Sequence, residues 1–273
     1  MSTELRHGGQ VTSSKEMATS VSTMLTKYAP QIELSVPGAA AGLLKPERII
    51  RLLLNEAGRI PALLQCTPAS LVGAMLTSAA LGLEIGAHLG HGYILPFKGV
   101  ATFVPGYKGL VALAYRSQQI ASLHAHVVYQ HDDFRVELGT EPSIHHVPAI
   151  DRDPGPARYY YAVAKLTTGG VVFNRPMTVA DVQKVMRASP SSKRSGGPWQ
   201  THFDEMALKT CIRRIAKVLP ASSELAQAVA IDDAVEGGKR PIVPPELDWL
   251  PSEATGTGGE DITDGETVEE PQS

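Results

Sequence analysis

The chain has 273 residues, 43% of them hydrophobic, and a formal net charge of -3 at pH 7. This length and apolar content suffice for one large globular domain or two smaller ones. No run approaches 18 consecutive apolar residues, and the first thirty positions lack the basic-then-apolar order of a signal peptide. The sequence therefore indicates neither a membrane span nor secretion, and a cytoplasmic protein is expected.

The charge is unevenly distributed along the chain. Residues 241–273 hold nine acidic residues and no Lys or Arg, whereas residues 1–240 hold 25 basic and 19 acidic residues. Such a split favours a folded body that faces an anion and an acidic tail that competes for the same surface or binds a partner. A tail that only aids solubility is the alternative. We expect disorder over residues 1–15 and 237–273, and one folded domain over residues 16–236.

Helical spacing predicts three helices in the first third of the chain. The first covers residues 16–28 and is followed by a loop rich in Ala, Gly and Pro. The second, KPERIIRLLLNEAGRI, begins with Pro46 at a first helical position. The third, TPASLVGAMLTSAALGLE, has Thr67 as its cap and Pro68 directly behind it.

Alternating or β-branched runs then predict six strands, most of them linked as hairpins. One helix, GYKGLVALAYRSQ, interrupts them. Two helices follow: TVADVQKVMRA, with Thr178 and Asp181 at capping-box spacing, and the long PWQTHFDEMALKTCIRRIAKVLP, begun by Pro198. The six strands are expected at Tyr93–Pro96, Val100–Val104, Ile120–Tyr129, Phe134–Leu138, Tyr159–Thr167 and Val171–Arg175.

The motifs that would indicate catalysis are missing. There is no phosphate-binding GxxxxGK motif followed by Ser or Thr, and GHGYIL supplies only the first two glycines of GxGxxG. The acid pair Asp132 and Asp133 lies beside a predicted turn with no nearby E-x-K motif, which disfavours a metal-dependent nuclease. Cys66 and Cys211 are isolated, so we expect two buried thiols and no zinc site or disulfide.

Histidines are the remaining candidates for a metal site. His124 and His126 alternate onto one face of a strand and could bind a metal together with His88 or His91. No matching acid or cysteine spacing accompanies them, so packed or solvent-facing histidines are favoured.

Basic residues form a more informative pattern in the last helix. At 100° per residue, one side of this helix is cationic and the opposite side packs Phe203, Ala207, Cys211, Ile215 and Val218. Arg214 falls at the edge of the apolar side, where a phosphate or an internal carboxylate would hold it. A solvated charged face is the alternative. The cationic side carries His202, Lys209, Arg213 and Lys217.

Cations and rings also alternate elsewhere. The segment from Gly90 to Val128 contains no acidic residue, and the loop ASPSSKRSGGPW is basic and glycine-rich. Cationic grooves with interleaved rings are typical of proteins that bind single-stranded nucleic acid, because phosphates need cations and unpaired bases need flat apolar faces. Tyr107, Phe97 or Trp199 are predicted to stack on bases, with core positions for Phe97 and Trp199 as the alternative. The further DNA-binding candidates in these segments are Lys108, Arg116, Lys193 and Arg194.

Three runs in order, LGLEIGAHLGHGYILPF, GYKGLVALAYRSQQIASLHAHVVYQHDDFRVELG and GPWQTHFDEMALKTCIRRIAKVLP, resemble the RecT family of phage recombinases. The resemblance covers about residues 20–235. It implies an ATP-independent protein, not an enzyme, that binds single-stranded DNA, anneals complementary strands and assembles into rings or filaments. It also implies an α+β fold with a mostly antiparallel β-sheet and packed helices that line a basic groove.

Further implications concern partners. The resemblance implies work in the host bacterial cytoplasm beside a companion phage exonuclease and the host single-strand-binding protein. No cofactor is required on this basis, with Mg²⁺ only modulating annealing.

The chain departs from the family pattern at Pro105, where a small aliphatic residue is usual. Its hairpin between Phe97 and Val104 is short, with Lys98 as its one base, which weakens a phosphate-binding role there. A metal-dependent nuclease component and a passive single-strand-binding module remain the alternatives.

Overall fold

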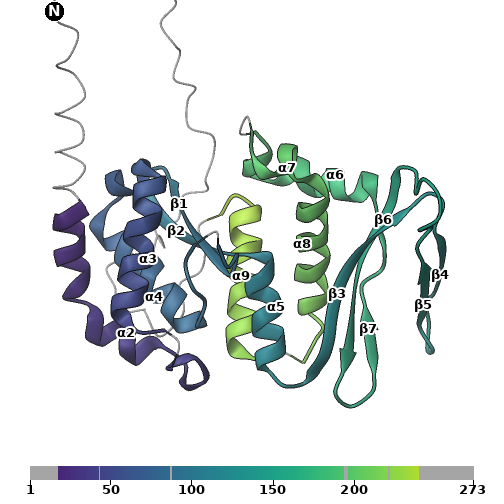
Figure 1. Ribbon diagram of the computed structural model, residues 1–273, viewed down its shortest axis with the longest axis horizontal. Helices are drawn as coiled ribbons and strands as arrows, with labels where there is room; N and C mark the ends of the chain where they lie inside the picture. The colour runs from purple at the N-terminus through teal and green to yellow at the C-terminus, as the bar shows by residue number, and fades with distance from the viewer. Residues whose placement is uncertain (1–17, 43, 87, 194–195, 221, 240–273) are drawn as a thin grey trace, which may run out of the picture. The chain divides into compact units, whose positions relative to one another are not determined.

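The computed structural model describes residues 18–42, 44–86, 88–193, 196–220 and 222–239 (Figure 1). The expected disordered ends, apart from residues 237–239, and Arg194 lie outside these ranges. The described chain forms two compact units. The first unit comprises the residues up to Gly109 and those from Gln227 onward, and the second unit comprises Leu110–Ala226.

The first unit is mainly helical. Residues 18–26 are helical, and α2 (Ala29–Ser35), α3 (Pro46–Arg59) and α4 (Pro68–Leu81) follow. Every residue of α4 from Ser70 onward is buried, as expected for a helix that is apolar on all sides. The predicted cap is confirmed, because the Thr67 side chain accepts a hydrogen bond from the Ser70 amide. Helix α2 lies where the sequence predicted a loop.

A tight hairpin packs on α4. Strands β1 (Gly92–Phe97) and β2 (Val100–Pro105) pair antiparallel. The two residues between them, Lys98 and Gly99, have φ angles of 48° and 76°, as a two-residue hairpin turn requires. The hairpin is fixed to the start of α4, because the Ala101 amide donates to Ser70 Oγ at 2.9 Å.

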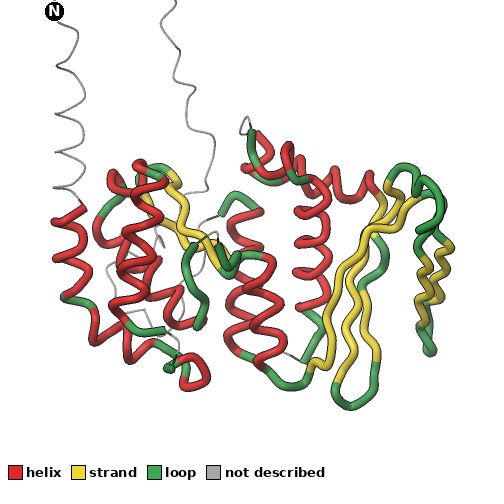
Figure 2. The backbone as a smooth tube through the Cα atoms, viewed as in Figure 1, coloured by secondary structure: helices red, strands yellow, loops and turns green. Residues whose placement is uncertain are grey.

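The second unit is built on an antiparallel sheet (Figure 2). Its central strand is β6 (Ala157–Leu166), which pairs with β3 (Ile120–Tyr129) on one side and with β7 (Val171–Phe173) and β8 (Met177–Thr178) on the other. Helix α8 (Phe203–Ala216) packs on one face of β3 and β6, as Figure 1 shows. The α+β class and the antiparallel sheets are confirmed.

The remaining elements of the second unit surround this sheet. Helix α6 (Val179–Ala188) begins with the predicted capping box between Thr178 and Asp181. A separate hairpin is formed by β4 (Asp133–Glu137) and β5 (Ser143–Val147), of which β5 was not predicted. The described residues also form three short 3-10 helices, of which Pro190–Lys193 lies in the second unit, and Gly38–Ala40 and Pro61–Gln65 lie in the first.

The single long helix predicted from Pro198 is wrong. The chain breaks at His202, whose φ and ψ are -142° and 53°, so that α7 (Pro198–Thr201) and α8 are separate helices. Two helices cross the boundary between the units: α5 (Tyr107–Arg116), which was predicted, and α9 (Ser223–Glu236), which was not. Within the described ranges, no helix has the length and apolar character needed to cross a membrane.

Candidate nucleic-acid interface

The start of α5 packs against the preceding loop without room for side chains. The Gly106 amide donates to the His91 carbonyl at 2.9 Å. A Cβ at Gly106 would lie 2.1 Å from the Gly90 carbonyl oxygen, and one at Gly109 would lie 2.0 Å from the His91 carbonyl oxygen. Both positions require glycine because two backbones approach closely. The PGYKG sequence therefore forms the tightly packed junction between β2 and the first turn of α5.

This turn positions Tyr107 and Lys108, two of the predicted DNA-binding residues. Tyr107 is half-buried and Lys108 is exposed. The stem of Lys108 passes close to Gly90, since its Cδ would lie 3.4 Å from a Cβ there. Arg116, at the other end of α5, is half-buried, and its charge is one of the influences on Glu224. Burial would raise the pKa of Glu224, but hydrogen bonds and Arg116 outweigh it and lower that pKa. Arg116 therefore already interacts with a carboxylate of its own unit.

The cationic residues around α8 are divided between solvent and interior. His202, Arg214 and Lys217 are exposed and Lys209 is half-buried. Arg213, which the helical wheel placed on the solvent side, is buried with 8% of its surface exposed. The wheel also placed Arg214 beside the apolar residues, whereas the structure exposes it. Arg213 and Arg214 thus exchange their predicted environments.

The reason lies in how α8 is enclosed. Val218, taken as part of the apolar side, lies beyond the end of the helix and is 66% exposed. Thr210, Cys211 and Ile212 are all buried, so the apolar surroundings extend over more of the helix than one stripe. Cys211 is buried as predicted, and burial raises the pKa of its thiol to about 12 against the opposing influence of Arg214.

The basic loop and the tryptophan that follows it differ in their exposure to solvent. Lys193 is exposed at the end of the 3-10 helix Pro190–Lys193. Trp199 is 1% exposed, and its ring lies 6.0 Å from that of Phe203. Trp199 is therefore a core residue, the alternative that its sequence left open, and its ring has no exposed face for a base. Phe97 is half-buried near the tip of the first hairpin.

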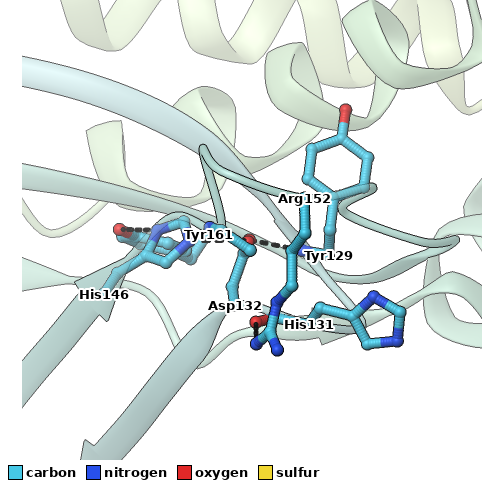
Figure 3. A network of polar contacts seen from close by, with 7 residues as sticks. Tyr129, His131, Asp132, His146, Arg152 and Tyr161 are labelled. Carbon is cyan, nitrogen blue, oxygen red and sulfur yellow. Dashed lines mark hydrogen bonds and ion pairs between the residues drawn. The ribbon is translucent and has the colours of Figure 1, made fainter.

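A buried polar network joins the hairpin β4–β5 to the sheet (Figure 3). The side chain of Asp132 is 1% exposed. It accepts hydrogen bonds from the Tyr129 amide at 2.7 Å, the Ala149 amide at 2.9 Å and His146 Nε2 at 3.0 Å. His146 Nδ1 lies 3.1 Å from the Tyr161 hydroxyl. The tautomer in which Nε2–H donates to Asp132 leaves Nδ1 to accept from the Tyr161 hydroxyl, so that both ring nitrogens have a partner.

This network bears on the nuclease alternative. Burial alone would raise the pKa of Asp132, but the hydrogen bonds from Ala149, Tyr129 and His146 outweigh it and lower the pKa. The carboxylate is thus held ionised by donors of the protein itself. No group of three or more His, Cys, Asp or Glu side chains in the described part of the chain is placed to hold a metal ion. Sequence reasoning considered Asp132 only beside Asp133 and missed its contact with His146.

Comparisons with known proteins agree with the resemblance in the sequence. Residues 47–244 match the RecT family. The chain is 39% identical to Protein RecT of Escherichia coli (strain K12) over 212 residues, which are 75% of this chain and 77% of that protein. It is 29% identical to the uncharacterized protein YqaK of Bacillus subtilis (strain 168) over 167 residues, 61% of this chain and 57% of that protein. The chain therefore belongs to the RecT family, a family of DNA recombination and strand annealing.

Proposed function

We propose that this protein is an ATP-independent annealing protein that binds single-stranded DNA and pairs complementary strands in phage recombination. The match to the RecT family over most of the chain carries this proposal. Exposed cations in both units support it, since a strand needs several phosphate contacts for useful affinity. Oligomerisation into a ring or filament is part of the proposal, because annealing long strands requires many subunits along the DNA.

Annealing on this account needs no chemical step. The protein lowers the repulsion between two polyanions, keeps bases from folding into hairpins and presents them for pairing. Duplex formation supplies the free energy. We propose that the phosphates meet Lys108 in the first unit, where Tyr107 shapes the surface beside it, and Arg116 in the second unit. The other cations proposed to meet phosphates in the second unit are Lys193, Arg194, His202, Lys209, Arg214 and Lys217.

The buried residues take a different role in the proposal. Arg213 and Trp199 support the surface from within rather than contact DNA, because their side chains are enclosed. No cofactor is proposed, and Mg²⁺ acts only by screening phosphates. A host bacterial cytoplasm, a companion exonuclease and the host single-strand-binding protein complete the proposed setting. The acidic tail is the proposed contact for one of these partners.

We expect Arg214→Ala with Lys217→Ala to weaken binding to single-stranded DNA while leaving the melting temperature unchanged. Both side chains are exposed on or just after α8. If each meets a phosphate, the slope of log K against log salt falls by about 0.7 for each lost contact. Fluorescence anisotropy with an oligo-dT probe at several salt concentrations measures both quantities.

A matched control removes two positive charges elsewhere. Lys27→Ala with Lys184→Ala changes one exposed residue in each unit, and Lys184 makes only a 3.5 Å surface pair with Asp181. Surface pairs of this kind contribute about 0–1 kcal/mol. If the two double variants lose equal affinity, the effect is net charge and the assignment of Arg214 and Lys217 is wrong.

A further inference from the structure

The sheet of the second unit has two different faces. Tyr160 points to one face, where its hydroxyl donates to Asp204 of α8 and its ring contacts Phe203. Cα partners in an antiparallel pair point to the same side, and neighbours along a strand point to opposite sides. Tyr161 and its partner His126 therefore lie on the face turned away from α8. By the same register that face, here called the histidine face, carries His124, His126, Val163, Lys165, Val171 and Phe173.

The histidine face is accessible to solvent at these six residues, whereas Tyr161 on the same face is buried against Phe134 and His146 of the hairpin β4–β5. His124, His126, Lys165 and Val171 are exposed, and Val163 and Phe173 are half-buried. The solvent face of an antiparallel sheet normally carries polar residues. Here two valines and a phenylalanine accompany the histidines, so this surface is more apolar than the usual solvent face of an antiparallel sheet.

A continuous row of rings runs across this side of the sheet. His124 and His126 have ring centroids 6.1 Å apart, and His126 lies 5.5 Å from Tyr161. The row continues from Tyr161 to Phe134 at 5.6 Å and from Phe134 to Tyr159 at 5.7 Å. Tyr161, the middle ring of the row, is held by its hydrogen bond with His146, which also bonds Asp132. The exposed histidines are therefore held at the end of a rigid support.

The charge of this face favours a polyanion. None of the residues whose register places them on this side is acidic, and Lys165 stands among the rings. The Arg158 guanidinium lies 5.2 Å from the centre of the Tyr159 ring, at the other end of the row. Partial burial and the neighbouring histidines lower the pKa of His126, so its ring is mostly neutral at pH 7. Neutral flat rings beside cations suit stacked bases with phosphates alongside.

We propose that the histidine face is a second contact for single-stranded DNA, in which His124, His126 and Phe173 stack on unpaired bases and Lys165 meets a phosphate. The inference rests on the proposed function. This contact lies across the sheet from α8, so one subunit presents two separate surfaces to unpaired DNA. An antiparallel sheet with exposed rings is a known platform for single strands.

The test compares two double variants of the full chain that each remove one histidine and one lysine. His124→Ala with Lys165→Ala changes the histidine face. His145→Ala with Lys184→Ala is the control, because His145 is 64% exposed on β5 and Lys184 is 70% exposed on α6. Binding of oligo-dT, measured by anisotropy, is expected to weaken about tenfold in the first variant, the scale of one stacked base, and little in the control.

Two further measurements keep the outcome unambiguous. His124→Phe restores a ring without a titrating group, so it should bind oligo-dT like the unchanged protein if stacking is the interaction. The alternative is that the histidine face binds a second copy of this chain. Sedimentation of the variants without DNA tests this, because it measures their assembly state. Loss of assembly with unaltered oligo-dT binding would overturn the proposal, as would equal affinity of the two double variants. If the unchanged protein binds no oligo-dT, the proposed function itself fails.

Discussion

Asp132→Ala is expected to destabilise the second unit, at about 1–3 kcal/mol for each enclosed polar group that is left unpaired. The buried carboxylate accepts from two backbone amides and from His146, so its loss leaves three donors without an acceptor. The urea midpoint of unfolding measures the effect. Asp133→Ala is the matched control, because the neighbouring carboxylate is 77% exposed and should change stability little. Equal midpoints for the two variants would show that the network does not hold the hairpin.

The same carboxylate predicts a pH dependence. Its pKa in the folded protein is below its ordinary value of 3.8, so the unfolded chain takes up the proton first as the pH falls. The stability that Asp132 contributes is complete above about pH 5 and is lost as the pH falls through the lowered folded value. Asp132→Asn should remove this part of the acid sensitivity. An unchanged difference in unfolding free energy between pH 7 and pH 3 in that variant would contradict the assignment.

Trp199→Ala is expected to cost about 3–5 kcal/mol of folding stability, as truncations of buried tryptophans do. The ring is 1% exposed and packs against Phe203, so the variant leaves a cavity between α7 and α8. DNA binding should fall only in proportion to the unfolded fraction. Trp199→Phe keeps most of the ring volume, and should retain most of the stability and all of the binding. If the Trp199→Ala protein keeps its melting temperature but loses DNA binding, Trp199 stacks on bases and the core assignment is wrong.

The elements that sequence predicted well are those with local signals. Ile120–Tyr129 forms a strand with the predicted ends, because β-branched and apolar residues alternate between two turns. Helices α4 and α6 begin where Thr67 and Thr178 predict, since a cap satisfies amides within three residues of itself.

The failures depend on contacts between distant residues. Strand β5 has the sequence SIHHV, whose local pattern is weak, and it forms because it pairs with β4 and brings His146 to Asp132. The exchange of Arg213 and Arg214 depends on what surrounds α8, which a helical wheel of one helix cannot show. The histidine face follows from the register of β3, β6 and β7. The sequence indicated only that His124 and His126 lie on the same side of one strand.

The most direct test of the central claim is annealing of two complementary labelled oligonucleotides by the purified protein, without ATP. We predict that the protein pairs the strands faster than they pair alone, and that neither strand is shortened. Addition of ATP should leave the rate unchanged. Strands that stay unpaired although both are bound would identify a passive single-strand-binding protein, and shortened strands in the presence of Mg²⁺ would identify a nuclease. Either result would contradict the proposed function.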